Sequence, residues 1–347
     1  FLRGVAKFNL DDLLGADTDF SAAIVKNPVF TTAYIYRALT RTRMGNYDDA
    51  LQDFREAIDL RPDLPDAYYS RGYTRLQNKQ YEEAIEDFDK FIFQENKVAD
   101  AYIGRGTAYL YLKDTVRALE NFDQAIRTNR ENPNGYYQRG TLLLQKEEYA
   151  RAEADFDMSI RCDSAFLPPY FNRAVVYSNT NRPMQALADF DRVLQLDSTN
   201  SFTYFNRAIL RTQIGDYNRA LDDFDRVALY SPGNVQVYYL RAMLKTRLGD
   251  LEGAERDYTR AIELYPDFAN AYLNRSALRY ALHNPKAAKR DEEIAQRKIA
   301  EYKSHLKDST YSIYADTTQR MDKLLAFDNQ FTNNYFDRIS EQPSLGR

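Results

Sequence analysis

The same residue types return at intervals of 34 along this sequence, and this period constrains the fold more than any other feature does. Eight tyrosines stand in one register without a gap: Tyr34, Tyr68, Tyr102, Tyr136, Tyr170, Tyr204, Tyr238 and Tyr272. Only 28 of the 347 residues are tyrosine, so this register does not arise by chance. A fixed period of about 20 to 50 residues is typical of proteins in which one small structural unit is stacked many times.

Residues 31–64 predict two helices joined by a short turn. Tyr34 and Ala38 lie four residues apart and therefore share one face of the first helix. Gly45 interrupts that helix, and Phe54 lies on the apolar face of a second helix that Pro62 ends. Eight such units follow one another over residues 31–298. The same register extends backwards into residues 1–30, which are predicted to form a partial hairpin.

The order of large and small residues in this unit resembles that of the tetratricopeptide repeat family. With Thr31 as repeat position 1, the matching residues are Tyr34 at position 4, Ala38 at 8, Gly45 at 15, Tyr47 at 17, Ala50 at 20, Phe54 at 24, Ala57 at 27 and Pro62 at 32. The resemblance covers roughly residues 1–298. It implies an all-α, right-handed solenoid of eight full helical hairpins, preceded by one partial hairpin.

Charge, cysteine and histidine content narrow the classes of function. The net charge is −4, which argues against nucleic-acid binding because such proteins carry a strong basic excess. Cys162 is the only cysteine, so neither an intramolecular disulfide nor a thiolate metal cluster can form. No apolar run reaches the roughly 18 residues that a membrane span requires. We expect no cofactor and no bound metal.

An arginine at position 7 and an acidic residue at position 23 recur with the same period. The arginines are Arg37, Arg71, Arg105, Arg139, Arg173, Arg207, Arg241 and Arg275. Asp53 and its equivalents accompany them, with Asn121 as the exception. We interpret the two rows as a structural ladder of ion pairs between helices. The alternative is a row of arginines that binds anionic partners.

The resemblance also indicates where a partner would bind. In this family the first helix of each hairpin lines a concave groove, mainly through positions 2, 5, 6, 9, 12 and 13. At position 5 the predicted binding residues are Tyr69, Tyr137, Phe171, Phe205 and Tyr239. Exposed aromatic side chains of this kind mark interaction sites. The alternative is that position 5 packs against neighbouring helices.

Amide side chains at position 6 form a second set of predicted binding residues. They are Gln138, Asn172, Asn206 and Asn274. In some members of the family, asparagines at this position hold the backbone of a bound peptide, since an amide both donates and accepts hydrogen bonds. The alternative is a row of solvated polar residues. Positions 5 and 9 lack the basic residues and asparagines with which chaperone-binding members hold a carboxylate, so that function is not expected.

Catalysis receives little support from the sequence. The two histidines, His283 and His305, stand in no recognisable arrangement with a nucleophile, and there is no glycine-rich phosphate loop. Paired carboxylates such as Asp222 and Asp223 fit a solvated helix face better than acid–base chemistry. We therefore predict that the chain is not an enzyme.

The period is lost after residue 298. Residues 299–347 are predicted to be a helical cap followed by an irregular tail, with Ile299 and Tyr302 extending the last repeat helix and a further helix over 316–327. Because the sequence starts at Phe1 without methionine, we expect the native N-terminus to lie before it. The tail could lead into another domain.

The function that these features favour is a scaffold that binds an extended peptide or a partner domain in the groove. One alternative is an accessory region that presents substrates to a catalytic domain outside this chain, and another is a structural oligomerisation module. The expected partners are proteins or peptides, and self-association is an alternative. We expect neither nucleic-acid binding nor membrane insertion. The style of the repeat resembles bacterial arrays, some of them in the cell envelope. The periplasm or envelope is therefore the favoured compartment, with the cytoplasm as the alternative.

Overall fold

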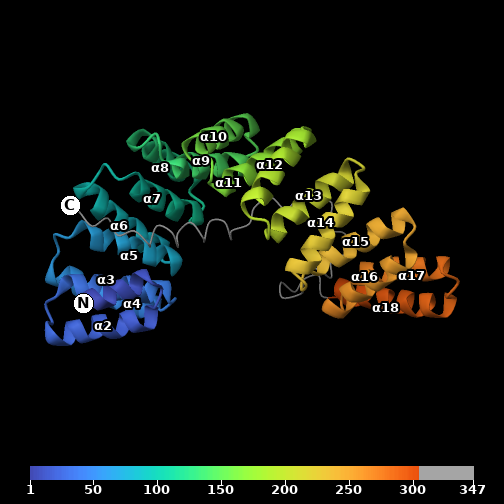
Figure 1. Cartoon of the computed structure of the whole chain (residues 1–347), viewed down its shortest axis with the longest axis horizontal. Coiled ribbons are helices and arrows are strands. Elements are labelled where there is room, and N and C mark those ends of the chain that lie inside the picture. The colour runs from blue at the N-terminus through green and yellow to red at the C-terminus, as the bar shows by residue number, and fades with distance from the viewer. Residues whose placement is uncertain (305–347) are drawn as a thin grey trace. The chain divides into compact units, whose positions relative to one another are not determined.

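Eighteen helices make up residues 1–304, which are the residues that the computed structural model describes (Figure 1). Within this part of the chain no residue lies in a β-strand. The expected all-α class, a solenoid of 34-residue helical repeats, is confirmed. The helix expected over 316–327 and the irregular tail lie outside the described residues.

The chain divides into two compact units, and each is described by itself. The first, Phe1–Asn172, holds α1 (Leu2–Asn9), α2 (Leu13–Lys26), α3 (Thr31–Arg43), α4 (Tyr47–Leu60), α5 (Pro65–Gln77), α6 (Tyr81–Gln94), α7 (Ala99–Tyr111), α8 (Thr115–Thr128), α9 (Pro133–Gln145) and α10 (Tyr149–Cys162). The boundary falls inside α11 (Leu167–Asn179). The second unit, described over residues 173–304, holds α12 (Pro183–Leu196), α13 (Ser201–Gln213), α14 (Tyr217–Tyr230), α15 (Val235–Leu248), α16 (Leu251–Leu264), α17 (Ala269–Ala281) and α18 (Pro285–Ser304).

From α3 onwards the helices form eight hairpins, in which the odd-numbered helix is called helix A and the even-numbered helix is called helix B. Helix A has 13 residues in the hairpin α3–α4, and helix B has 14. The pair α1–α2 precedes them with a first helix of only 8 residues. Eight full hairpins and one partial hairpin are therefore present, as the period predicts.

A residue whose backbone adopts the left-handed conformation, at position 15, ends the turn between helix A and helix B in every hairpin. Glycine occupies this place only three times, at Gly45, Gly215 and Gly249. The other residues there adopt the same positive φ, near +60°: Asp11, Lys79, Lys113, Glu147, Asn181 and His283. Residues with a Cβ adopt this conformation at a cost, so the turn is imposed by the packing of the hairpin and not by glycine alone.

The core of every hairpin except the last is built around the aromatic residue at position 24 of helix B, and the last hairpin has Glu292 there. These side chains are almost fully buried: Phe20, Phe54, Phe88, Phe122, Phe156, Phe190, Phe224 and Tyr258. Alanine at position 20 is fully buried in all eight hairpins and lets the helices approach closely. A Cβ at Gly106 would lie 2.7 Å from Cε1 of Phe122, so position 8 must stay small where this ring reaches helix A.

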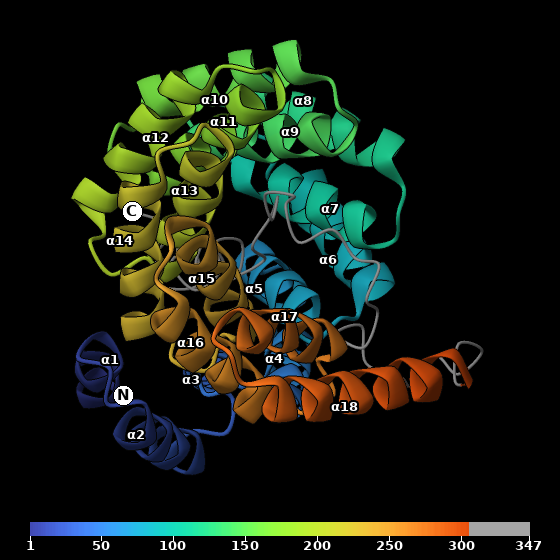
Figure 2. The same cartoon turned by 90° about the vertical axis from the view of Figure 1, so that its right-hand side faces the viewer.

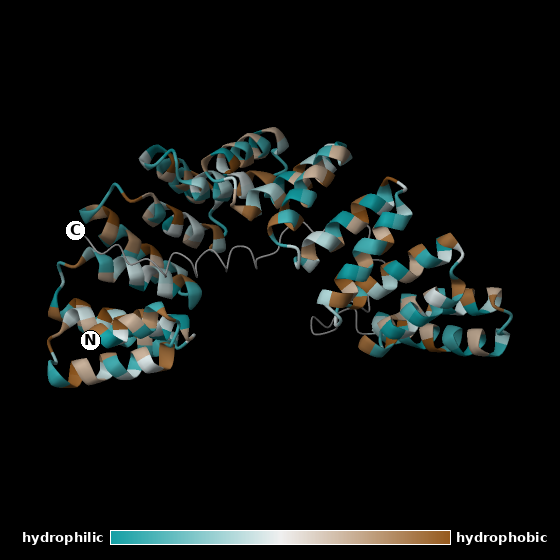
Figure 3. Cartoon of the chain, viewed as in Figure 1, coloured by the Kyte–Doolittle hydropathy of each residue, from teal (hydrophilic) through white to brown (hydrophobic). Residues whose placement is uncertain are grey.

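The outer faces of the helices are polar. Hydrophilic and hydrophobic residues alternate along each helix (Figure 3), as expected of amphipathic helices that bury one stripe. The last helix, α18, has 20 residues and is longer than the 14-residue helices B before it (Figure 2). It continues through residue 298, where the repeat period was expected to end, and includes Ile299 and Tyr302.

Candidate functional site on the helix A face

The position-7 arginines of helix A bind the acidic residues of helix B in the same hairpin. In each pair, the Nε and Nη2 atoms of the arginine donate to the two carboxylate oxygens of the residue 16 positions later. The pairs are Arg3–Asp19, Arg37–Asp53, Arg71–Asp87, Arg139–Asp155, Arg173–Asp189, Arg207–Asp223, Arg241–Asp257 and Arg275–Asp291. At the exception, Arg105 donates to Oδ1 of Asn121 at 2.7 Å. Two-point contacts of this kind are the strongest that arginine makes.

The remaining guanidinium nitrogen, Nη1, connects several of these arginines to the preceding hairpin. Arg139 Nη1 lies 2.6 Å from Oδ1 of Asp123, and Arg241 Nη1 lies 2.8 Å from Oδ1 of Asp225. Asp123 and Asp225 occupy position 25 of the hairpin before. The hydrogen bond to Asp155 raises the pKa of the Arg139 guanidinium, so its charge is held firmly. These bonds support the prediction that the row is a structural ladder, because Arg139 and Arg241 each join three helices.

The tyrosines that define the period also connect neighbouring hairpins. The hydroxyl of Tyr238 donates to the carbonyl oxygen of Pro232 at 3.2 Å, and Tyr102 donates in the same way to Asn96. The guanidinium of Arg241 lies 5.4 Å from the centre of the Tyr238 ring, within the range of a cation–π contact. Position 4 therefore has a packing role, which explains its strict recurrence.

The aromatic residues at position 5 are largely buried, contrary to the expectation that they form an exposed row. Phe171 is 1% exposed, and Tyr137, Phe205 and Tyr239 are also buried. Ring centres at positions 5 and 24 of one hairpin lie close together, at 6.2 Å for Phe205 and Phe224. The alternative interpretation, in which position 5 packs against neighbouring helices, describes these four rings. Their role in binding stays a prediction.

Tyr69 differs from the other position-5 rings because it is only half-buried. Its ring centre lies 4.8 Å from that of Phe91 and 5.0 Å from that of Tyr73. This environment raises the pKa of the Tyr69 hydroxyl above its ordinary value, since burial disfavours the phenolate. Tyr69 thus belongs to an aromatic cluster whose edge reaches the surface.

The amides at position 6 face neighbouring helices more than solvent. Asn172 Nδ2 donates to Thr141 Oγ1 at 3.0 Å, and Asn274 Nδ2 donates to the hydroxyl of Tyr239 at 3.0 Å. Gln138 and Asn206 are buried, yet the Nε2 atom of Gln138 and the Oδ1 atom of Asn206 make no hydrogen bond within residues 1–304. A buried polar atom without a partner costs about 1–3 kcal/mol, so these two amides retain unused bonding capacity.

At positions 9 and 12, helix A is exposed only in the last two full hairpins. Met243 at position 9 is 45% exposed, and Tyr280 at position 12 is 47% exposed. Ala277 at position 9 and Thr246 at position 12 are also exposed. In the six earlier full hairpins position 9 is buried, and position 12 is buried or half-buried. The helix A surface of Met243, Thr246, Ala277 and Tyr280, called the α15–α17 surface below, can therefore be reached directly by a partner.

The predicted binding residues do not include Met243 and Tyr280. Residue type gave no signal, because apolar residues occupy position 9 in most hairpins and are buried there in the six earlier ones. The signal that was available is the end of the period at residue 298. Tyr280 belongs to the last hairpin of the period, and within residues 1–304 no further helix A follows it.

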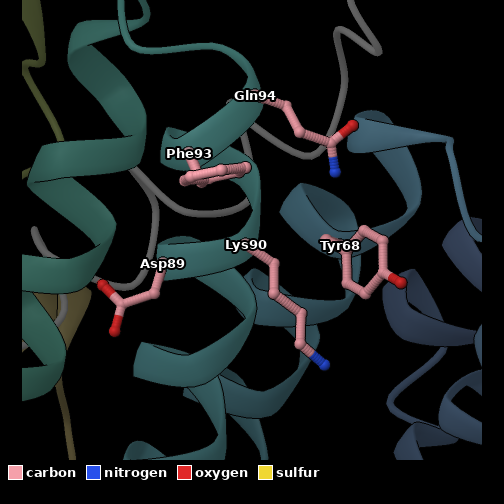
Figure 4. Close-up of a pocket in the computed structure, with 5 residues that line it drawn as sticks. All are labelled: Tyr68, Asp89, Lys90, Phe93 and Gln94. Atoms are coloured by element: carbon pink, nitrogen blue, oxygen red, sulfur yellow. The ribbon is translucent and has the colours of Figure 1, made fainter.

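A separate open pocket of about 300 Å³ lies on helix B of the second full hairpin (Figure 4). Tyr68, Asp89, Lys90, Phe93 and Gln94 line it. The Nζ atom of Lys90 lies 5.3 Å from the centre of the Tyr68 ring, and Phe93 is 90% exposed. The sequence analysis did not single out this place, because a lone aromatic residue on a polar helix face carries no periodic signal.

Among residues 1–304 no group of three or more His, Cys, Asp or Glu side chains could hold a metal ion. None of the described helices combines the length and the apolar composition that crossing a membrane requires. Cys162 is half-buried, with its Sγ 3.5 Å from the carbonyl oxygen of Arg130.

Comparison with solved structures identifies the same fold in other proteins. A tetratricopeptide repeat protein from Parabacteroides merdae shares 19% sequence identity, with a TM-score of 0.51, over 77% of this chain and 98% of the other. The pilF protein of Pseudomonas aeruginosa shares 21% identity, with a TM-score of 0.53, over 58% and 92%. A chain of the APC/C hetero-tetramer Cut9-Hcn1 shares 16% identity, with a TM-score of 0.54, over 82% and 54%. At these identities the likeness concerns the fold.

Family models match three separate segments of the sequence. The models are described as TPR repeat for residues 38–79, and as tetratricopeptide repeat for residues 103–165 and 235–268. A search of curated proteins found no match. The matched segments lie in both compact units and follow the period that Tyr34 begins. The chain is therefore a tetratricopeptide repeat protein.

Proposed function

We propose that this chain binds an extended segment of a partner protein on its helix A face, and that the α15–α17 surface is where the partner first makes contact. A protein-interaction scaffold is the general class that the repeats and the fold support. The observation that carries the finer proposal is the exposure of Met243 and Tyr280 at positions where the side chains of the six earlier full hairpins are buried or half-buried. Exposed apolar side chains gathered on one face of a monomer mark interaction sites.

The chemistry of this surface suits an extended segment with apolar side chains. Met243 can adapt its shape because it is unbranched, and Tyr280 offers a ring with a polar end. Asn274 lies on α17, six residues before Tyr280. Its Nδ2 atom donates to the hydroxyl of Tyr239, which leaves its carbonyl oxygen as an acceptor for a peptide N–H. The unused Oδ1 atom of Asn206, in α13 of the same unit, is part of the same proposal.

The test uses a peptide selected against the purified chain from a random library, with its affinity measured by calorimetry. Replacing Met243 and Tyr280 together by alanine is expected to weaken binding by about 2 kcal/mol or more, as loss of a central anchor does. The melting temperature should stay close to that of the parent, because both side chains are nearly half exposed. The matched control is Met184→Ala, which removes an exposed apolar side chain from helix B.

The double variant Phe171→Ala with Phe205→Ala provides the contrast. Both rings are buried, so we expect it to lose several kcal/mol of stability, since truncating a buried phenylalanine costs about 3–5 kcal/mol. If it instead stays stable and only loses the peptide, the position-5 row is the binding surface after all. If neither double variant affects binding, the proposal for the helix A face is wrong.

A further inference from the structure

A regular row of arginines lies on the helices B of the second unit. Arg192, Arg226 and Arg260 occupy repeat position 26 of α12, α14 and α16. The equivalent residues in the first unit are Glu56, Lys90, Gln124 and Met158, so the row of arginines belongs to the second unit. Because one repeat position recurs at the same place in successive hairpins, the three side chains project from the same side of the stack.

These arginines differ from those of the ladder in how they are bonded. Arg260 is 46% exposed and pairs with Glu263 of its own helix at 3.1 Å, and its guanidinium lies 6.0 Å from the centre of the Tyr238 ring on helix A. Arg226 is exposed and forms no ion pair among the described residues, whereas every position-7 arginine except Arg105 holds a carboxylate at two points. Exposed pairs such as Arg260–Glu263 contribute little to stability. The ion pairs of the fold therefore do not require Arg226 or Arg260.

Apolar side chains accompany the row, one helical turn further along. Leu196 and Tyr230 at position 30 are 41% and 38% exposed, and Leu229 beside them is 65% exposed. Residues four apart share one face of a helix, so each apolar side chain lies next to the arginine that precedes it. The arginine–apolar surface is defined as Arg192, Leu196, Arg226, Leu229, Tyr230 and Arg260.

We infer that the arginine–apolar surface of the second unit is a docking site for an acidic segment of another protein that also carries apolar side chains. Charge complementarity selects the acidic residues, because guanidinium groups bind carboxylates at two points. The exposed side chains of Leu229 and Tyr230 contact the apolar side chains of the partner segment. This site lies on helix B and is independent of the helix A face proposed above.

A nucleic acid fits this surface less well than a protein does. Single-stranded nucleic acids need exposed ring faces on which bases can stack. The position-4 tyrosines Tyr170 and Tyr238 beside the row are buried, and Tyr230 is 38% exposed.

The experiment measures binding of a labelled synthetic peptide with the repeating sequence Glu-Glu-Leu to the whole chain by fluorescence anisotropy. The triple variant Arg192→Gln, Arg226→Gln, Arg260→Gln should bind it at least about tenfold more weakly, which is the effect of losing one charge-assisted contact. The control variant, Lys286→Gln, Lys289→Gln, Arg290→Gln, removes the same charge from exposed residues of α18 and should bind normally. A Gln-Gln-Leu peptide should bind the parent weakly.

Equal loss in the triple variant and in the control would show non-specific attraction and overturn the proposal. Equal binding of the Glu-Glu-Leu and Gln-Gln-Leu peptides would do so too, since charge would then play no part. Tighter binding of oligo(dT) than of the acidic peptide would assign the surface to nucleic acid instead. The melting temperature of the triple variant serves as the folding check, and Leu229→Ala with Tyr230→Ala provides a second, uncharged variant that should also weaken the peptide.

Discussion

At the scale of single residues, the strictest recurrences in the sequence belong to structure. Each position-7 arginine except Arg105 forms a two-point ion pair, and several reach back to position 25 of the preceding hairpin. At position 4, Tyr102, Tyr170 and Tyr238 donate to a carbonyl oxygen at the end of the hairpin before. A residue that must make the same inter-repeat contact in every hairpin cannot vary, whereas a residue that contacts a single partner can.

The ladder predicts a large loss of stability on truncation. Arg173→Ala leaves Asp189 buried without its two-point partner, whose bonds are 2.7 and 2.8 Å long. We expect the free energy of unfolding, measured with urea, to fall by roughly 3 kcal/mol, because breaking a buried pair by removing one partner costs about 3–5 kcal/mol. Peptide binding should be unchanged.

Arg226→Ala is the matched control, because that side chain is exposed and forms no ion pair within the described part of the chain. Its effect should stay within about 0.5 kcal/mol. Equal stability of the Arg173 and Arg226 variants would show that the ladder is not structural.

Buried tyrosines predict a loss of stability at high pH. Burial raises the pKa of Tyr137 and of Tyr258 to about 12. In the unfolded chain a tyrosine has a pKa of about 10, so the folded chain holds the proton more tightly. The stabilisation is complete below about pH 10 and declines as the pH rises from about 10 to 12.

This decline can be followed by urea unfolding at a series of pH values, with tyrosinate absorbance as a second measurement. The double variant Tyr137→Phe, Tyr258→Phe should show a shallower decline, since neither side chain can ionise. An identical pH dependence of the parent and the double variant would mean that other groups control alkaline unfolding.

At the scale of elements, the turn between helix A and helix B shows how packing overrides residue preference. Lys79, Lys113 and Glu147 adopt a positive φ of about 60° at the position where other hairpins have glycine. The left-handed conformation costs a residue with a Cβ roughly 1–2 kcal/mol, and the eight hairpins nevertheless share it. The turn is set by the need to bring the two apolar stripes together.

This strain predicts stabilising substitutions. Replacing Lys79, Lys113 and Glu147 by glycine should raise the free energy of unfolding by up to about 1 kcal/mol each, with part of the gain offset by the greater freedom of glycine in the unfolded chain. Thermal unfolding of the triple variant checks the sum. Gly215→Ala, at the same position with a φ of +83°, should shift the melting temperature in the opposite direction. A triple variant less stable than the parent would contradict this account of the turn.

At the scale of the whole molecule, stability should vary along the described chain. Each hairpin of a repeat protein contacts only its neighbours, so an end hairpin has one partner where an inner hairpin has two. The first pair of helices is also incomplete, with 8 residues in α1. Hydrogen exchange measured by mass spectrometry should show faster exchange in residues 1–30 than in α7 and α8. Uniform protection of these segments would contradict the expectation.

The sequence by itself determined the fold class, the family, the number of hairpins and the position of their turns. It could do so because a 34-residue period repeats each packing constraint many times. Residues equivalent to Phe54 and Ala50 therefore recur along the chain. The recurrence of Arg37 and Asp53 also indicated a ladder, although the identity of the atoms that bond in each pair required coordinates.

Only the tertiary structure decided which side chains a partner can reach. Tyr137 and Phe171 are buried, whereas Met243 and Tyr280 are exposed on helices A of the same kind. The residue types do not distinguish these cases, because exposure depends on the side chains of the neighbouring hairpins and on whether another helix follows. The recurrence of Arg226 and Arg260 at one repeat position was equally readable in the sequence, but only coordinates show that their bonds differ from those of the ladder. A period reports what every hairpin shares, and a binding surface is made where hairpins differ.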